Sequence, residues 1–191
     1  MASGADALGF NFYKRSARYI SPEKAAEICA KVPAFVTTVG LFVNEPLVDV
    51  NRILREVGLG LLQFHGDETP EYCESLGYPY MKALRATSGD QIKEEAQSFE
   101  SSQGILVDTA TDGQFGGTGK TFDWSLLPDL GQPLVLAGGL VAANVGAAIA
   151  ATHPYAVDVS GGVERSKGVK DMAEMKKFVE AVQAADRSSN E

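Results

Sequence analysis

The sequence predicts an α/β fold in which parallel strands and helices alternate along the chain. Short apolar stretches rich in β-branched residues alternate with amphipathic helical patterns, which favours a parallel sheet covered by helices. The units recur about every 25 residues, a spacing closer to a (β/α)₈ barrel of the TIM type than to a doubly wound sheet. We therefore expect residues 1–191 to form a single (β/α) barrel domain. Seven of its eight βα units are visible, with strands starting near residues 5, 35, 60, 81, 105, 134 and 156.

The first part of the chain predicts four strands separated by three helices. Ser21 followed by Pro22 has the residue order of an N-cap and a first helical turn. Thr69 and Pro70 open another helix, and Gly77 stands where a glycine closes it. The predicted strands are residues 5–12, 35–43, 60–64 and 81–84, and the predicted helices are residues 22–32, 46–57 and 70–76.

The remaining part predicts three further strands and ends on a helix. Glu174 follows Asp171 by three residues, which is the spacing of a capping box, so the last helix is expected to begin at Asp171. Its tail is expected to fray over residues 185–191. The predicted strands are residues 105–108, 134–137 and 156–159, the predicted helices are residues 90–99 and 141–151, and residues 122–127 form a short turn or helix.

An eighth βα unit is not visible in the sequence. Barrels of this kind usually have about 250 residues, with a lower limit near 200, and this sequence has 191. Ser3 and Gly4 have the pattern of a helix end that leads into a strand. We expect that the first strand and most of the first helix are absent from these residues.

Composition and charge exclude several classes of protein. The net charge of −8 without a cluster of Lys and Arg argues against a nucleic-acid partner. No apolar stretch reaches the ~20 residues of a membrane helix, and the N-terminal residues lack the pattern of a signal peptide. Cys29 and Cys73 cannot by themselves form a disulfide framework or a zinc site, and both fall on predicted buried helix faces. A cytoplasmic protein is expected.

The active site of such a barrel lies at the C-terminal ends of the strands. Asp108 ends an apolar strand, where partial shielding from water raises a carboxyl pKa and suits a general acid. The alternative is a hydrogen bond within its loop. Asp158 is a second candidate, with a structural carboxylate as the alternative. Arg18 is a binding candidate or part of a solvated basic turn. His65 is a candidate or a histidine held by a structural hydrogen bond. The strand ends together offer Arg18, Gln63, His65, Lys82, Arg85, Asp108, Gly138, Gly139, Asp158, Ser160, Gly161 and Gly162.

Two glycine pairs follow the last two strands, Gly138 with Gly139 and Gly161 with Gly162. Glycine allows backbone N–H groups to turn toward one point and a ligand to approach closely. Beside a helix N-terminus this is an anion site, and in barrels the last two βα loops commonly bind phosphate. We therefore predict a phosphorylated small-molecule ligand at these two loops, rather than two simple tight turns.

A third glycine-rich motif, residues 116–121, ends like a nucleotide-binding P-loop. The P-loop pattern needs a glycine where this sequence has Gln114, and Pro128 follows too soon for the long helix that the pattern requires. We exclude a nucleotide phosphate loop here. The glycines predict an active-site flap, with a plain solvent loop as the alternative.

Several motifs together resemble the phosphoribosylanthranilate isomerase family of tryptophan biosynthesis. They are Gly-Ala-Asp-Ala-Leu-Gly-Phe-Asn-Phe-Tyr at residues 4–13, Ser-Ala-Arg-Tyr-Ile-Ser at 16–21, Gln-Phe-His-Gly at 63–66, Val-Asp-Thr at 107–109, Gly-Gly-Thr-Gly-Lys-Thr-Phe-Asp-Trp at 116–124, Ala-Gly-Gly-Leu at 137–140 and Val-Asp-Val-Ser-Gly-Gly-Val-Glu at 157–164. The resemblance extends over nearly the whole chain in the order of the family.

The resemblance implies a cofactor-free (β/α)₈ barrel enzyme that is a monomer or a homodimer. It implies that N-(5-phosphoribosyl)anthranilate is converted to 1-(2-carboxyphenylamino)-1-deoxyribulose 5-phosphate by an Amadori rearrangement. Asp108 would be the general acid that protonates the ribose ring oxygen, and Arg18 would pair with the anthranilate carboxylate. The phosphate would be held by Gly138, Gly139, Ser160 and Gly161, and the remaining substrate-binding residues would be Gln63, His65 and Asp158.

One motif of the family is not found in these residues. The family's general base is a cysteine in a Lys-Ile-Cys-Gly run at the end of the first strand, and Cys29 and Cys73 match other positions. The alternatives to an isomerase are a non-catalytic sugar-phosphate-binding barrel fragment and another sugar-phosphate barrel enzyme such as an epimerase. An epimerase needs metal-binding histidines or an opposed pair of acids, and we expect no metal.

Overall fold

The computed structural model describes residues 3–85, 88–109 and 124–188. The described chain falls into two compact units. Among the described residues, the first unit consists of residues 5–83 and 101–103, and the second consists of residues 3–4, 84–85, 88–100, 104–109 and 124–188. The motif at residues 116–121, and with it the predicted flap, lies outside the described residues.

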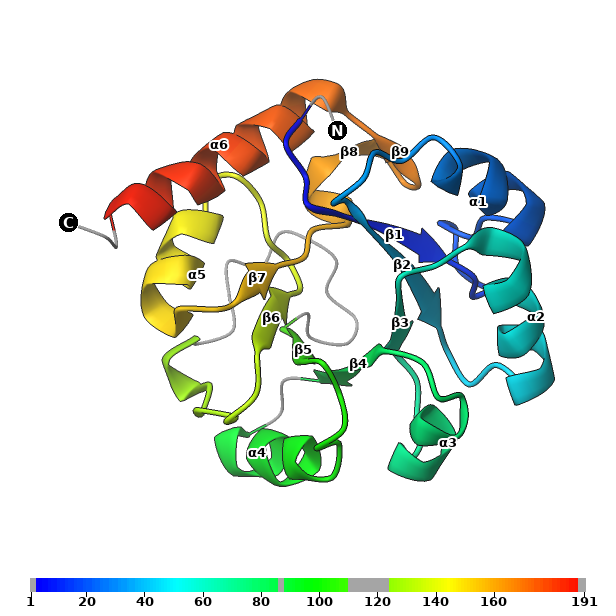
Figure 1. Ribbon diagram of the computed structural model, residues 1–191. Helices are drawn as coiled ribbons and strands as arrows, with labels where there is room; N and C mark the ends of the chain where they lie inside the picture. Colours follow the sequence, from blue (N-terminus) through cyan, green and yellow to red (C-terminus); the bar gives the residue numbers. More distant parts are fainter. Residues whose placement is uncertain (1–2, 86–87, 110–123, 189–191) are drawn as a thin grey trace. The chain divides into compact units, whose positions relative to one another are not determined.

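Four parallel strands and three helices build the first unit (Figure 1). Strand β1 pairs with β2, β2 with β3 and β3 with β4, all in parallel register. This confirms the predicted alternation of parallel strands and helices. The elements are β1 (Ala7–Asn11), α1 (Pro22–Cys29), β2 (Thr37–Phe42), α2 (Leu47–Val57), β3 (Leu61–Phe64), α3 (Pro70–Ser75) and β4 (Tyr80–Arg85), the last of which continues into the second unit.

Helix caps predicted from the sequence are present in this unit. The Ser21 hydroxyl accepts the Lys24 N–H at 3.3 Å, and Thr69 Oγ1 accepts the Tyr72 N–H at 3.3 Å. Each cap satisfies a backbone donor that the first helical turn leaves without an intrahelical acceptor. Gly77 has φ +58°, the left-handed conformation that glycine adopts at low cost after a helix.

The second unit contains three parallel strands and an antiparallel hairpin. Strand β5 pairs with β6 and β6 with β7, both in parallel, whereas β8 and β9 form the hairpin. None of the described helices has the length and apolar character that a membrane span requires. The elements are α4 (Gly89–Gln97), β5 (Ile105–Asp108), η1 (Trp124–Leu126), β6 (Leu134–Ala137), α5 (Val145–Thr152), β7 (Ala156–Val157), η2 (Gly161–Val163), β8 (Glu164–Ser166), β9 (Val169–Lys170) and α6 (Met172–Ser188).

The structure corrects two predicted helix ends in this unit and adds a hairpin. Helix α5 begins at Val145 rather than at residue 141, because Asn144 Oδ1 accepts the Val141 N–H at 2.8 Å and forms a turn there. Helix α6 continues to Ser188 instead of fraying from residue 185, since Ala185 packs against the core. The hairpin β8–β9 was not predicted at all.

The start of α6 is capped as predicted, although the capping box is only half formed. Asp171 Oδ1 accepts the N–H groups of Ala173 and Glu174 at 2.8 and 3.2 Å. Glu174 turns outward to Lys177, 2.7 Å away, instead of closing the box. The Asp171 N–H donates to the carbonyl of Val163 at 2.8 Å, which ties the helix start to η2.

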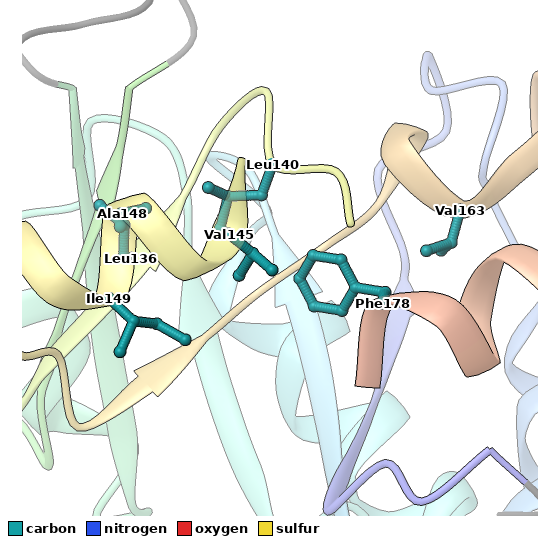
Figure 2. Close-up of a cluster of buried hydrophobic side chains, with 7 residues drawn as sticks. All are labelled: Leu136, Leu140, Val145, Ala148, Ile149, Val163 and Phe178. Atoms are coloured by element: carbon teal, nitrogen blue, oxygen red, sulfur yellow. The ribbon is translucent and has the colours of Figure 1, made fainter. Parts of the chain in front are cut away.

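A buried apolar cluster, which we call the loop-anchoring core, holds the second unit together (Figure 2). Leu140 and Val163 enter it from the two segments that directly follow the glycine pairs, and the Phe178 ring enters it from α6. Burying such side chains removes apolar surface from water and fixes the backbone that carries them. Both glycine loops are therefore anchored in one core. Its buried members are Leu136, Leu140, Val145, Ala148, Ile149, Val163 and Phe178.

Candidate functional site

The C-terminal ends of β5, β6 and β7 bring the candidates of the second unit to one edge. Asp108 pairs in register with Ala137, directly before the first glycine pair. Leu136 pairs with Val157, and the Asp158 N–H donates to the Leu136 carbonyl at 2.8 Å. Asp108, Gly138 and Asp158 thus end adjacent strands, as the sequence predicts.

The backbone at Asp108 is fixed by the residue that follows it. Thr109 Oγ1 donates to the carbonyls of Ala137 and Gly138, at 2.8 and 2.9 Å, and the Thr109 N–H donates to the Ala137 carbonyl at 3.0 Å. The three residues before Asp108 are fully buried, while Asp108 itself is half-buried. A partly shielded carboxyl on a rigid strand end fits the predicted general acid, and that role remains a prediction.

The first glycine pair adopts a conformation that suits glycine. Gly138 has φ +88° and Gly139 has φ +62°, in the left-handed region where a Cβ atom causes strain. Asn144 Nδ2 donates to the Gly139 carbonyl at 3.1 Å and so braces the loop from its far end. The loop is a fixed turn immediately before α5.

The second glycine pair lies directly against the first loop. A Cβ atom on Gly162 would lie 1.9 Å from the Leu140 carbonyl oxygen and 3.1 Å from Val141 Cγ1. The absent side chain therefore allows two backbone segments to touch, and this contact places both predicted phosphate loops next to each other. The sequence named Gly162 at a strand end, but only the structure shows what its lack of a side chain permits.

Replacing Gly162 by Ala should push the two loops apart. The clash is with backbone rather than with a flexible side chain, so we expect a loss of about 1–3 kcal/mol in the free energy of unfolding, as for other overpacked sites. Inorganic phosphate should also bind more weakly. Chemical denaturation and calorimetric titration with phosphate check both effects.

Gly146→Ala is the matched control for this substitution. Gly146 lies on α5, where an added Cβ would meet only Ala185 Cβ at 4.0 Å, and alanine favours a helix over glycine. The control should keep its phosphate affinity and its stability. If Gly162→Ala has the same stability and the same phosphate affinity as this control, the contact between the loops contributes to neither.

The hairpin β8–β9 brings a lysine that the sequence analysis did not single out back to the second glycine pair. Lys170 pairs in register with Glu164 across the hairpin. Its Nζ donates to the Ser160 carbonyl at 2.8 Å and lies 3.3 Å from Glu164 Oε1. No short sequence pattern marks this contact, because it depends on a hairpin whose strands have only three and two residues.

In the first unit, Gln63 and His65 follow one another at the end of β3. Gln63 is buried, and its Nε2 lies 2.9 Å from His65 Nδ1. This hydrogen bond holds the His65 ring beside the Gln63 amide. The backbone N–H of His65 donates to the Phe42 carbonyl at 2.9 Å. This imidazole is therefore oriented by its neighbours.

The loop that follows β1 holds Arg18 by a set of local hydrogen bonds. Asn11 Oδ1 accepts the Tyr13 N–H at 2.9 Å, and Asn11 Nδ2 donates to Ser16 Oγ at 3.3 Å. Ser16 Oγ in turn accepts the Arg18 N–H at 3.1 Å. Arg18 is half-buried, and its role in binding remains a prediction.

A buried ion pair connects the loops that follow β2 and β3 with strand β4. Lys82 is 3% exposed and Glu68 is 6% exposed, and Lys82 Nζ lies 3.3 Å from Glu68 Oε2. Lys82 also donates to the Gly66 carbonyl at 2.5 Å, while Glu68 accepts the N–H groups of Gly66 and Asn44 at 2.8 and 2.7 Å. The sequence offered Lys82 as a strand-end candidate and missed Glu68. The structure shows the pair fixing the segment beside His65.

Lys82→Met should destabilise the protein by about 3–5 kcal/mol, because it leaves the Glu68 carboxylate buried without its cation. Chemical denaturation measures the loss, and Lys82→Met combined with Glu68→Gln should recover part of it. Lys24→Met removes a lysine from an exposed pair with Glu27 and should cost less than about 1 kcal/mol. Equal losses for the two lysines would contradict a structural role for the buried pair.

Neither cysteine has the environment of a nucleophile or a base. Cys73 is fully buried, and burial raises the pKa of its thiol to about 12. Burial also raises the pKa of Cys29, which is half-buried. Within residues 3–85, 88–109 and 124–188, no three His, Cys, Asp or Glu residues gather as ligands for a metal ion.

The chain is similar to known proteins over almost its whole length. The family model of N-(5'-phosphoribosyl)anthranilate (PRA) isomerase matches residues 1–181. N-(5'-phosphoribosyl)anthranilate isomerase of Pseudomonas putida is 54% identical over 184 residues, which cover 96% of this chain and 89% of the relative. The enzyme of Pseudomonas syringae pv. tomato is 52% identical over 181 residues, covering 94% and 88%.

Solved structures give the same result for the fold. Phosphoribosyl anthranilate isomerase from Thermotoga maritima matches with a TM-score of 0.86 at 40% identity, covering 96% of this chain and 90% of that one. A phosphoribosyl anthranilate isomerase in complex with reduced 1-(o-carboxyphenylamino)-1-deoxyribulose 5-phosphate matches with a TM-score of 0.82 at 36% identity and the same coverage. These likenesses confirm the predicted fold class.

Proposed function

The chain belongs to the N-(5'-phosphoribosyl)anthranilate isomerase family, and from this premise we propose how its residues carry out the reaction. The reaction converts N-(5-phosphoribosyl)anthranilate to 1-(2-carboxyphenylamino)-1-deoxyribulose 5-phosphate, an isomerisation of tryptophan biosynthesis. The observation that carries the assignment to residues is the contact between the two glycine loops, made at Gly162 and the Leu140 carbonyl. It supports one phosphate site built from both loops.

The phosphate is held by backbone rather than by a basic surface. Gly138, Gly139 and Gly161 let the main chain approach an anion closely, and Ser160 adds a hydroxyl donor. Backbone N–H groups act over a short range, so this site is compatible with the net charge of −8. The phosphate anchors the substrate and leaves its reacting carbons at the strand ends.

Asp108 acts as the general acid. It gives a proton to the ribose ring oxygen, the ring C–O bond breaks, and the anilino nitrogen forms a Schiff base with C1. Arg18 pairs with the anthranilate carboxylate, for which a planar guanidinium is suited. Gln63, His65 and Asp158 contact the remaining polar groups of the substrate. These roles follow the family resemblance and fit the placement of each residue within its own unit.

The second half of the reaction needs a general base. Removal of the C2 proton from the Schiff base gives an enamine, which becomes the ketone of the product. The family uses a cysteine in a Lys-Ile-Cys-Gly run for this step, and residues 1–191 contain no such run. Burial raises the pKa values of the Cys29 and Cys73 thiols, which disfavours the thiolate that a base requires.

The other properties of the protein follow from this function. The partner is a small phosphorylated molecule, without cofactor, metal, nucleic acid or membrane, and the reaction takes place in the cytoplasm. The protein acts as a single barrel domain, a monomer or a homodimer. One solved structure is that of mutually generated monomers of the dimeric enzyme from Thermotoga maritima.

The test combines binding with turnover. The protein should bind the reduced product analogue that one solved relative contains, and calorimetric titration measures this. Turnover is followed by the change in fluorescence as the substrate is consumed. Binding of the analogue without turnover, even when the family's cysteine is supplied, would instead favour a non-catalytic sugar-phosphate-binding protein. Absence of both would contradict the proposed function.

A further inference from the structure

We propose that Lys170 is a positioning residue for the phosphate site, acting through the peptide bond between Ser160 and Gly161. This inference rests on the proposed function, because it assigns a task to a side chain that borders the proposed phosphate loop. It adds a residue that lies outside every motif that carried the family resemblance. Lys170 Nζ donates a hydrogen bond of 2.8 Å to the Ser160 carbonyl.

This hydrogen bond fixes the direction of a neighbouring donor. In a trans peptide the C=O and N–H groups point in opposite directions across one rigid plane. A cation that holds the Ser160 carbonyl therefore makes the Gly161 N–H point away from Lys170. An anion that accepts from this N–H lies on the opposite side of the peptide, so Lys170 acts through the peptide rather than as a direct ligand.

The loop needs such a constraint because glycine leaves it free to turn. Gly161 and Gly162 are adjacent, and a glycine peptide can rotate between several allowed backbone conformations. Gly162 is held by its contact with the Leu140 carbonyl, and Val163 is held in the loop-anchoring core. The peptide in front of them is held from the other side by Lys170, whose charge also polarises the Gly161 N–H.

The hairpin explains how the lysine is kept in place. Lys170 pairs with Glu164 in the β8–β9 register, and its Nζ lies 3.3 Å from Glu164 Oε1. The Glu164 side chain is 5% exposed, whereas that of Lys170 is 41% exposed. The buried carboxylate therefore orients the more exposed lysine toward Ser160.

The test compares the affinities of three ligands that carry different parts of the substrate. In Lys170→Met, inorganic phosphate and the reduced product analogue should bind about fivefold to twentyfold more weakly, the effect of losing one charged hydrogen bond at a partly exposed site. Anthranilate, which has no phosphate, should bind as in the parent. In the turnover assay, KM should rise while kcat stays within about twofold. Lys170→Arg keeps a charged donor and should restore most of the phosphate affinity.

Lys176→Met is the matched control, since it removes a lysine from an exposed pair with Glu180 on α6. It should leave all three affinities unchanged. Unchanged phosphate affinity in Lys170→Met would overturn the inference while the proposed phosphate site stands. Equal weakening of anthranilate and phosphate would also overturn it, because that result indicates a general structural defect. A parent protein that binds neither phosphate nor the analogue would overturn both the inference and the proposed site.

Discussion

Replacing Asp108 by Asn should lower kcat by about 10²- to 10⁴-fold and change KM little. An amide cannot donate the proton that opens the ribose ring, and general acid catalysis contributes a rate factor of about this size. The amide has nearly the same shape, and the backbone at this position is held by the hydrogen bonds of Thr109 to Ala137 and Gly138. The loss should therefore appear in the chemical step rather than in folding.

The measurement is steady-state turnover in a protein that carries the family's cysteine run ahead of residue 1. Asp90→Asn serves as the control, since Asp90 is an exposed carboxylate in the first turn of α4. The control should keep both kcat and KM. A protein with Asn at position 108 that keeps most of the parent kcat would remove Asp108 from the role of general acid.

Supplying the family's cysteine should have an effect of similar size. We expect residues 1–191 alone to turn over the substrate at least about 10²-fold more slowly than the same residues preceded by a strand ending in Lys-Ile-Cys-Gly, because the base of the second step is then present. Neither protein needs Cys29 or Cys73, whose pKa values burial raises. Parallel fluorescence assays of the two proteins measure the ratio.

The control for this second prediction is the preceding segment with Ser in place of its Cys. It restores the same length of chain, but a hydroxyl is a much poorer base than a thiolate. It should bind the reduced product analogue as well as the cysteine protein does and remain slow. Fast turnover by residues 1–191 alone would show that another residue of this chain serves as the base.

Much of the fold can be predicted from local patterns. Strands β5 and β6 have the predicted bounds, residues 105–108 and 134–137, because a parallel strand covered by helices leaves an apolar run in the sequence. Helices α1 and α3 begin where Ser21 and Thr69 predict their caps. In these cases the signal lies within a few residues of the structure that it determines.

Features that depend on distant partners were not predicted. The β8–β9 hairpin has too few residues for an alternating pattern. The place of Lys170 beside the second glycine pair depends on its hydrogen bond to Ser160, ten residues away. Glu68 resembles any acidic residue before a helix until Lys82 is seen beside it. The same holds for the candidate site. Asp108 and both glycine pairs could be predicted from local motifs, whereas the distant residues that hold them in place could not.

The loop-anchoring core has a consequence for how this protein responds to variation. Leu140 and Val163 lie in the same buried cluster as Phe178 of α6, so we expect the proposed binding loops to be ordered before any ligand arrives and to lose little conformational entropy on binding. Affinity for phosphate is then partly a property of hydrophobic packing. Substitutions on the inner faces of α5 and α6 that loosen this packing should therefore weaken substrate binding, although the altered side chains do not touch the substrate. In a genetic screen they would be found as nutritional defects that excess substrate relieves.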